Sequence, residues 1–340
     1  MNKITVKFIG LILLLGILFF VDLFVGSVFI SPKEVLASFF GTASDPINYE
    51  IIVNYRLPKA LTAILVGAAL SVSGMFMQTL FNNPLAGPDV LGINSGAGLG
   101  VAIFTLLGTS SFVYGLSGIS GYGILLSGIA GALLVLLLVT VVSVKVIDSV
   151  SLLIVGIMFG NIAGAIISIL QNVSNPDSIK LFIVWTFGSL SGVTWDYMSM
   201  LAPTITVGLL LAYTVQKQMD ALLLGENYAK GLGIHIFKLR FVIILITALL
   251  AGTSTAFAGP IAFIGVTVPH IARGLFGTSR HGVIIPASLL CGASLLVVCD
   301  IISQLPGTGL SIPINAVCAL FGAPVIIWII FFRQKTSRYF

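Results

Sequence analysis

Charged residues are scarce in this chain, and their scarcity excludes an ordinary soluble protein. Only 8% of its 340 residues are Asp, Glu, Lys or Arg, whereas 58% are hydrophobic, and the mean hydropathy is +1.15. A soluble globular chain carries about 25% charged residues, so there is too little polar surface here to cover a body surrounded by water. Residues 90–144 contain no charged side chain at all. That stretch alone could cross a bilayer twice, at roughly 20 residues a crossing.

Further absences narrow the function. The phosphate-binding motif Gly-x-x-x-x-Gly-Lys-Ser/Thr does not occur, so the chain has no nucleotide-binding loop of its own. No basic cluster suits nucleic acid. No nucleophile–base constellation indicates an enzyme, and we expect no catalytic residue. The histidines have no carboxylate or thiol near them in the sequence, and the cysteines lack metal-binding spacing, so we expect no metal site and buried cysteines. These residues are His235, His270, His281, Cys291, Cys299 and Cys318.

Apolar runs and their breaks predict an all-α, polytopic membrane protein with about ten transmembrane helices in a single domain, 1–340. The runs lie near 8–30, 59–81, 90–108, 118–144, 149–171, 196–215, 240–260, 262–275, 282–302 and 313–332. The eighth is short and interrupted by Gly and Pro. Such a segment is tolerated only where protein or a water-filled cavity surrounds it.

Basic residues predict the orientation. With ten crossings and a cytoplasmic N-terminus, twelve Lys and Arg fall inside and four outside, as the positive-inside rule requires. The inner residues are Lys3, Lys7, Lys145, Lys217, Lys230, Lys238, Arg240, Arg273, Arg280, Arg333, Lys335 and Arg338, and the outer ones are Lys33, Arg56, Lys59 and Lys180. We therefore expect both termini in the cytoplasm and a multi-pass location in the cytoplasmic (inner or plasma) membrane.

The second predicted span has small residues on one face and ends in an irregular turn. Gly67, Ser71 and Gly74 recur at spacings of four and three, a pattern that allows two helix backbones to approach closely. Asn and Pro residues then break the helix. The polar candidates here are Gln78, Asn82, Asn83 and Pro84. They either line a translocation path or cap the broken helix.

Two other segments combine apolar and polar residues. The inner loop 216–240 is amphipathic and predicts two short helices with a glycine hinge at the membrane surface. It is either an interfacial helix or a docking element for a cytoplasmic partner. The outer segment 172–195 contains a short apolar run that cannot span, with Trp185 and Trp195 as interfacial anchors.

Intramembrane acids would indicate an ion-driven carrier. The candidates that we consider are Asp22 and Asp300, both near the outer ends of their helices, where we expect them at the interface. A loose similarity between 55–98 and 248–270, five crossings apart, suggests an inverted repeat.

A series of short motifs runs along the chain. They include Arg56-Leu-Pro-Lys59, Gln78, Asn83-Pro-Leu-Ala86, Leu91-Gly92, Trp185-Thr-Phe-Gly-Ser-Leu190, Gly225-Glu226, Leu232-Gly233, Gly259-Pro260, Phe263-Ile-Gly265, Pro269-His270, Arg273 and Gly322-Ala-Pro324. Together they resemble the FecCD-type permease family, the membrane subunits of ABC importers for ferric siderophores, haem and vitamin B12. The resemblance covers nearly the whole chain, in order and at the family's spacing.

The resemblance implies a permease subunit that works with a second permease subunit, identical or paralogous. It also implies two cytoplasmic ATP-binding subunits that hydrolyse ATP, an extracytoplasmic substrate-binding protein and the lipid bilayer. No cofactor would bind this chain. The implied ATPase-coupling residues are Gly225, Glu226, Ala229, Leu232 and Gly233. Arg56 and Lys59 would meet acids on the binding protein, although family members often carry Arg where this chain has Lys59.

These expectations combine into a mechanism of alternating access for a ferric siderophore or a related iron chelate. The partner ATPases would shift the cytoplasmic segment and tilt two permease subunits against each other. The resemblance leaves haem and vitamin B12 open as cargoes. The alternative is a secondary transporter or channel that needs no ATPase. A membrane enzyme has no chemistry in the sequence to support it.

Overall fold

The computed structural model describes residues 3–26, 28, 30–39, 41, 45–107, 120–143, 149–304 and 311–332. Lys145, Arg333, Lys335 and Arg338, which enter the predicted charge bias, lie outside the described residues. The elements are α1 (Lys3–Phe24), α2 (Pro32–Phe39), α3 (Pro46–Glu50), η1 (Ile51–Arg56), α4 (Leu57–Leu80), η2 (Pro88–Leu91), α5 (Ile93–Leu107), α7 (Ser120–Ser143), α8 (Ser149–Val173), α9 (Pro176–Thr186), α10 (Trp195–Thr214), α11 (Gln216–Leu223), α12 (Glu226–Gly231), α13 (Ile236–Thr247), η3 (Ala248–Gly252), α14 (Thr253–Ala258), α15 (Ile264–Phe276), α16 (His281–Ser303) and α17 (Ile314–Phe332). All described secondary structure is helical, with η1 and η3 π-helical and η2 a 3-10 turn.

Each of the ten predicted apolar runs coincides with a helix or a continuous helical stretch. Among the described residues, six stretches are long and apolar enough to cross a membrane: Lys3–Phe24, Pro46–Leu80, Ser151–Val173, Trp195–Thr214, Ile236–Ala258 and His281–Ser303. Shorter apolar helices lie at Ile93–Leu107, Gly123–Val139 and Ile314–Ile327. The predicted all-helical class and several membrane-spanning helices are thus present.

The predicted break before the short eighth run lies between α14 and α15. Gly259 has φ +75° and Phe263 has φ +68°, so the chain leaves helical geometry at both ends of residues 259–263. The backbone N–H of Ala262 donates to Asn315 Oδ1 at 3.1 Å, from the start of α17. A polar side chain from another helix therefore satisfies the irregular backbone, as a membrane interior requires.

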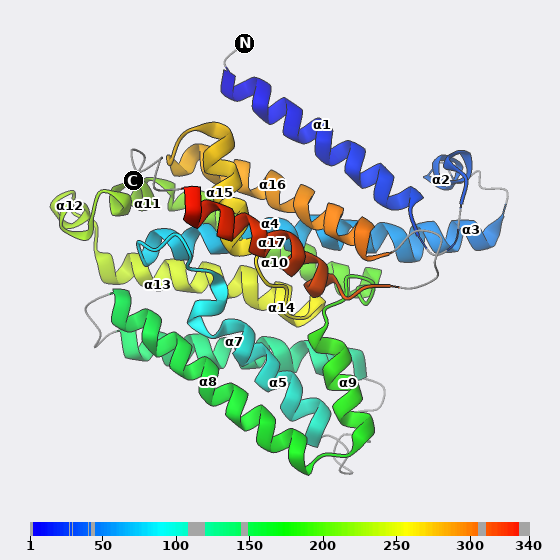
Figure 1. The fold of residues 1–340 in the computed structure, drawn as a ribbon, viewed down its shortest axis with the longest axis horizontal. Coiled ribbons are helices and arrows are strands. Elements are labelled where there is room, and N and C mark those ends of the chain that lie inside the picture. The colour runs from blue at the N-terminus through cyan, green and yellow to red at the C-terminus, as the bar shows by residue number, and fades with distance from the viewer. Residues whose placement is uncertain are drawn as a thin grey trace.

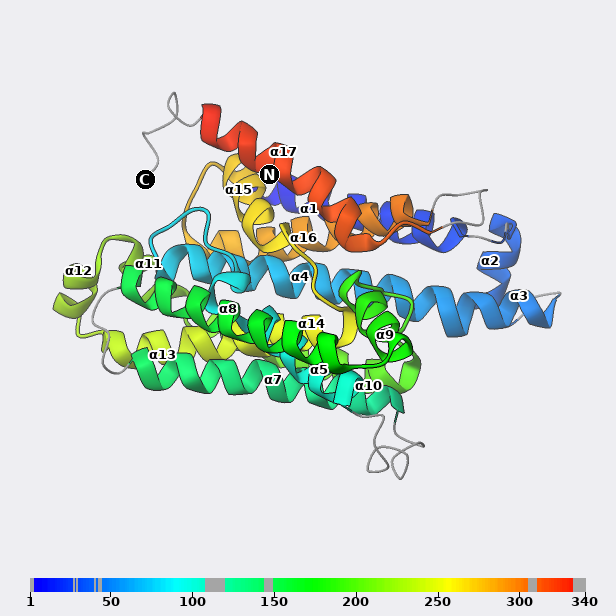
Figure 2. The same ribbon diagram turned by 60° about the horizontal axis from the view of Figure 1, so that its bottom comes forward.

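Helix α4 lies at the centre of the bundle (Figure 1). Helices α1, α15 and α16 lie on one side of it, and α5, α7, α8 and α9 lie on the other, in both ribbon views. Figure 2 shows α17 on the same side as α15 and α16. Within its most apolar window, the stretch Pro46–Leu80 is 83% buried, whereas the window of α1 is 6% buried. Helices α2 and α3 lie at one end of the long axis and α12 lies at the other.

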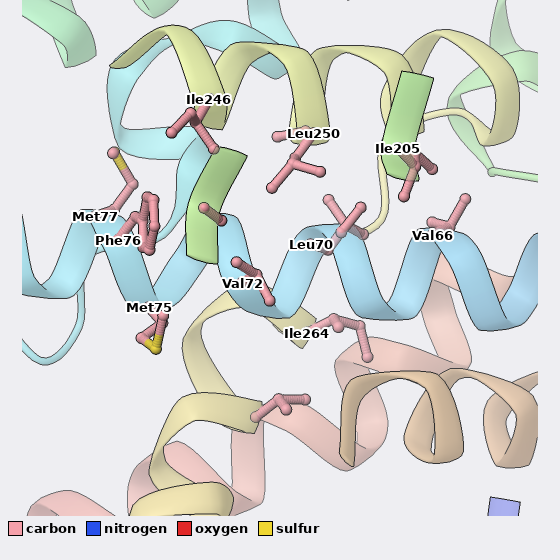
Figure 3. Packing of buried hydrophobic residues seen from close by; sticks show 14 of the residues in the cluster. Val66, Leu70, Val72, Met75, Phe76, Met77, Ile205, Ile246, Leu250 and Ile264 are labelled. Carbon is pink, nitrogen blue, oxygen red and sulfur yellow. The ribbon is translucent and has the colours of Figure 1, made fainter. Parts of the chain in front are cut away.

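The core forms around both faces of α4. Figure 3 shows Ile246 and Leu250 above this helix and Ile264 of α15 below it. Phe76 and Leu250 are fully buried. Because lipid is as apolar as these side chains, van der Waals packing rather than the hydrophobic effect holds such helices together.

The predicted small-residue face of α4 is a site of close backbone contact. A Cβ at Gly67 would lie 2.3 Å from the carbonyl oxygen of Gly292, and a Cβ at Gly74 would lie 1.9 Å from that of Gly265. Between them, Ser71 Oγ donates to the carbonyl oxygen of Ser288 at 2.8 Å. The prediction of close approach is confirmed, with α16 and α15 as the partners.

The peripheral helices expose large apolar side chains. Leu13 of α1, Leu137 of α7, Ile169 of α8 and Leu210 of α10 are each more than 60% exposed. A monomer in water rarely exposes extended apolar faces of this kind. These faces suit the hydrocarbon interior of a bilayer.

The outer segment contains α9, which is too short to span, as predicted. Trp195 is 40% exposed and its Nε1 donates to the carbonyl oxygen of Val53 at 2.9 Å. Trp185 instead stacks on Phe182, with ring centroids 6.1 Å apart, and belongs to a small interior cluster. Only Trp195 therefore has the exposure of a surface anchor.

Candidate functional site

The turn after α4 is tied to α15. Asn82 adopts a left-handed conformation with φ +45°. Asn83 Oδ1 accepts the backbone N–H of Leu85 at 3.0 Å, which closes the turn. His270 Nε2 lies 2.7 Å from the carbonyl oxygen of Pro84. The predicted break is therefore an ordered turn, and His270 contributes to it as a hydrogen-bond donor.

Gln78 makes a second connection to α15. Its Nε2 donates to the carbonyl oxygen of Val266 at 2.9 Å, and its Oε1 accepts from Arg273 Nη1 at 2.7 Å. The residue is 4% exposed in the single chain. Both ends of the amide are thus used between α4 and α15. Whether Gln78, Asn82, Asn83 and Pro84 also line a translocation path stays a prediction.

The loop 216–240 forms two short helices, α11 and α12, as predicted. Gly225 separates them with φ +108°, and Gly233 follows α12 with φ +80°. Neither position has another atom within 4 Å of an added Cβ. Glycine is favoured there because L residues with side chains rarely adopt these backbone angles.

One side of α12 faces the chain. Glu226 Oε1 lies 2.5 Å from Arg240 Nη2, so an ion pair ties the start of α12 to α13. Ala229 is fully buried. Two of the residues predicted to act in coupling, Glu226 and Ala229, therefore hold the element in place.

Three large apolar side chains in and next to α12 are exposed, and we call Leu224, Tyr228 and Leu232 the α12 surface. Their exposed fractions are 67%, 52% and 59%. Only Leu232 was among the predicted coupling residues. No helical period identifies the other two, because Gly225 interrupts the helix between Leu224 and Tyr228.

A chain of hydrogen bonds connects α11 with α16 and α4. Asp220 Oδ1 accepts the backbone N–H of His281 at 2.7 Å and lies 2.7 Å from its Nδ1. Thr79 Oγ1 lies 3.0 Å from His281 Nε2. Burial alone would raise the pKa of Asp220, but the hydrogen bonds from His281 lower it overall. Sequence reasoning missed this group because its members are far apart along the chain.

Arg56 and Lys59, predicted to meet a binding protein, are each only 6% exposed. The Arg56 guanidinium donates to the carbonyl oxygens of Leu23 at 2.8 Å and Phe24 at 3.1 Å, and to that of Val28. The carbonyls of Leu23 and Phe24 belong to the last turn of α1, where they have no partner within the helix, and Val28 lies four residues beyond that helix. Docking by Arg56 stays a prediction that this arrangement does not favour.

Lys59 lies between two carboxylates. Its Nζ is 2.8 Å from Asp300 Oδ2 and 3.7 Å from Asp22 Oδ1. Gln304 Nε2 donates to Asp22 Oδ1 at 2.9 Å. Asp22 is 0% and Asp300 4% exposed, so both are buried in protein, whereas their level at the membrane interface stays a prediction. A charged group is buried only where a partner compensates it, and Lys59 supplies that partner from α4.

Within the described part of the chain, no group of three or more His, Cys, Asp or Glu residues could hold a metal ion. The histidines of the bundle contact protein atoms instead, as described for His270 and His281. Cys291, Cys299 and Cys318 are free and buried, which confirms the prediction for them.

Comparison with known proteins identifies the family. The sequence model of the FecCD transport family matches residues 13–332. The chain is 35% identical over 322 residues to the vitamin B12 import system permease protein BtuC of Klebsiella pneumoniae, covering 94% of this chain and 92% of the relative. It is 35% identical to the protein of the same name in Vibrio cholerae, covering 95% and 92%.

Solved structures show the same fold. A chain from an inward-facing ABC transporter described as of metal-chelate type has a TM-score of 0.83 and 28% identity, covering 96% of this chain and 98% of that one. A chain of PsaBC from Streptococcus pneumoniae has a TM-score of 0.56 at 17% identity, which supports the fold alone. Because the family match spans almost the whole chain and the relatives exceed 30% identity over most of both lengths, this protein belongs to the FecCD transport family.

Proposed function

We propose that this chain is the membrane-spanning permease subunit of an ATP-binding-cassette importer that moves a bulky metal chelate, a ferric siderophore or related iron chelate, across the cytoplasmic membrane. It works by alternating access, driven by two cytoplasmic ATPases. Membership of the family and the names of its relatives, which are permease proteins of an import system, support this proposal.

The α12 surface carries the proposal. Leu224, Tyr228 and Leu232 are exposed at one end of the bundle, on an element that the Glu226–Arg240 ion pair fixes to α13. Exposed apolar residues on a rigid element at a polar end of a membrane protein are typical of a protein–protein contact. The ATPase is the partner that we assign to this surface, with Gly225 and Gly233 fixing the backbone turns.

The proposal includes ten crossings with both termini in the cytoplasm and the α12 end facing the ATPases. A second permease subunit, identical or paralogous, completes the pathway, and an extracytoplasmic binding protein delivers the cargo to the α2–α3 end. No cofactor binds this chain, since ATP is bound and hydrolysed by the partner. Two acids of the spans, Asp22 and Asp300, form ion pairs with Lys59, so neither is a free carboxylate for an ion-driven carrier.

The docking assignment can be tested with Leu232→Asp. We expect this variant to insert normally but to lose the co-purifying ATPase, because a carboxylate would be desolvated at the interface. Leu181→Asp is the matched control, because Leu181 is 63% exposed on α9. Equal ATPase recovery from both variants would reject the docking surface. Transport by the chain alone in vesicles without nucleotide would instead support a secondary transporter or channel.

Vitamin B12 is the second candidate cargo, favoured by the 35% identity to B12 permeases. The similar solved structure is described as a metal-chelate transporter, which favours the wider class of metal chelates as cargo. A deletion strain with and without this chain can be tested with labelled ferric siderophores, haem and cyanocobalamin. Uptake of a ferric siderophore that depends on the chain would support the proposed iron chelate as cargo. Uptake of cyanocobalamin alone would show that vitamin B12 is the cargo instead.

A further inference from the structure

Three side chains from three helices meet where α11 packs on the bundle. Asp220 belongs to α11, His281 is the first residue of α16, and Thr79 lies in the last turns of α4. We propose that Asp220, His281 and Thr79 are positioning residues that transmit a displacement of α12 to α4. This inference rests on the proposed function, because it assumes that a partner moves α12.

The proton arrangement makes the connection specific. An ionised Asp220 can only accept, so His281 Nδ1 carries a proton toward it. His281 Nε2 and Thr79 Oγ1 share one further hydrogen bond, and Thr79 Oγ1 also lies 3.1 Å from the carbonyl oxygen of Met75. The single Thr79 hydroxyl proton goes either to Nε2 of the imidazole or to Met75, so the chain of hydrogen bonds runs from the carboxylate of α11 to the Thr79 side chain on α4.

Burial makes the connection costly to break. His281 is 1% and Thr79 4% exposed, so water cannot replace a lost partner on either side chain. A buried polar group left without a partner has lost its hydrogen bonds to water and gained nothing in exchange. When α11 moves, α16 and α4 move with it more readily than the hydrogen bonds separate.

Helix α11 is also seated tightly on the start of α16. Met219 is fully buried, and a Cβ at Gly282 would lie 2.6 Å from Gln216 Oε1. At the other end of the segment, the Glu226–Arg240 ion pair holds α12 to α13. Force on the α12 surface therefore enters the bundle at two defined places. The ion pair leads to α13, which packs on α4 through apolar side chains such as Ile246, whereas the Asp220 connection reaches α4 through hydrogen bonds.

Thr79, the residue of α4 that His281 contacts, lies next to a residue that connects α4 to another helix. Gln78, the neighbour of Thr79, is hydrogen-bonded to Val266 and Arg273 of α15. One turn of the central helix thus connects to α11, α16 and α15. An Asp–His–hydroxyl arrangement also occurs in hydrolases, but here His281 and Thr79 are buried and have no access to a substrate, and a mechanical role fits their positions.

The test uses the complete importer in proteoliposomes and measures cargo molecules transported per ATP hydrolysed. Thr79→Val keeps the shape of the side chain but removes the hydroxyl, and Thr79→Ser restores the hydroxyl. We expect Thr79→Val to lower the ratio about five-fold or more, the lower end of coupling between sites, and Thr79→Ser to remain close to the unaltered protein.

A second pair tests the same connection from α11. Asp220→Ala removes the acceptor and should lower the ratio, whereas Asp220→Asn keeps an acceptor oxygen and should largely preserve it. Lys217→Ala, an exposed position on α11, is the control for a change of charge. ATPase co-purification is recorded for every variant and should not change, because none of these residues belongs to the α12 surface.

The outcomes distinguish failure of the Asp220–His281–Thr79 connection from failure of the proposed function. An unchanged ratio in both Thr79→Val and Asp220→Ala would overturn the connection while leaving the proposed function in place. Equal losses in Thr79→Val and Thr79→Ser would also overturn it, because the hydroxyl would not be the cause. Failure of the unaltered chain to bind any ATPase would reject the proposed function itself.

Discussion

Lys59 shows how a single residue can join three helices. It extends from α4 toward Asp22 on α1 and Asp300 on α16, and all three side chains are nearly inaccessible. Removing one partner of a buried ionic group leaves an uncompensated charge, which costs far more than the ion pair contributes. The two carboxylates would then repel each other as well.

We therefore predict that Lys59→Met destabilises the protein by about 3 kcal/mol or more. Thermal unfolding of the purified protein in detergent measures the effect. Lys33→Met, on the exposed face of α2, serves as the control and should change the midpoint little. Adding Asp300→Asn to Lys59→Met should recover part of the loss, because one of the two carboxylates is then neutral. No recovery would argue against the charge explanation.

Helix α4 packs so closely at its glycines that its shortest contacts are with the backbones of neighbouring helices. A Cβ at Gly74 would meet the backbone of Gly265, which cannot rotate away as a side chain could. Gly164 of α8 is the opposite case, because an added Cβ there has no atom within 4 Å. The same residue type therefore has different consequences in two helices of the same protein.

We predict that Gly74→Ala lowers the unfolding free energy by at least about 2 kcal/mol, since overpacked cores typically lose 1–3 kcal/mol. Gly164→Ala should be neutral or stabilising by up to about 1 kcal/mol, the difference in helix propensity. The measurement is the fraction of each variant that stays folded after heating in detergent. Equal behaviour of the two variants would show that α4 and α15 do not approach as closely as described.

The stability of helix α11 on the bundle depends on pH through the carboxyl group of Asp220. Its pKa is lower in the folded protein than its ordinary value near 4. A lowered folded pKa means that the ionised carboxylate adds stability that is complete above the ordinary value and lost as the pH falls through the folded one.

A fluorophore at Lys217→Cys should therefore report no change between pH 8 and pH 5 and a loosening of α11 below about pH 4. Asp220→Asn should remove this transition, because an amide does not titrate in this range. A transition that persists in Asp220→Asn would have to come from another group.

The whole molecule has two distinct ends. Both ribbon views place α12 at one end of the long axis and the short helices α2 and α3 at the other. In a bilayer these ends must lie on opposite sides, and the positive-inside rule assigns the α12 end to the cytoplasm. The buried native cysteines leave little background for labelling.

We predict that a membrane-impermeant maleimide labels Lys33→Cys in intact cells. It should label Lys230→Cys only after the membrane is permeabilised. Both positions are exposed in the chain. Labelling of both from outside would contradict the orientation and with it the assignment of α12 to a cytoplasmic partner.

Much of the architecture was predictable because it depends on patterns local in sequence. Apolar runs gave the helices, and the spacing of Gly67, Ser71 and Gly74 gave the close-contact face. Glycines gave the hinge of α11 and α12. Each of these features follows from backbone geometry or helix periodicity, which a sequence carries directly.

The contacts that could not be predicted join side chains that are distant in the chain. Asp22 and Asp300 lie near helix ends, and only the fold shows that Lys59 lies between them. Thr79 and His281 are separated by 202 residues. Pairing at such distances depends on tertiary packing and leaves no local pattern.

The ionic contact of Lys59 has a consequence for biogenesis. Asp22 emerges from the ribosome first, Lys59 soon after, and Asp300 last, 300 − 59 = 241 residues later. At 5–20 residues per second, synthesis of that interval takes roughly 12–48 s. We expect the translocon or a chaperone to shelter the first two helices together during this delay, so that the lysine and one aspartate enter the lipid as a neutral pair.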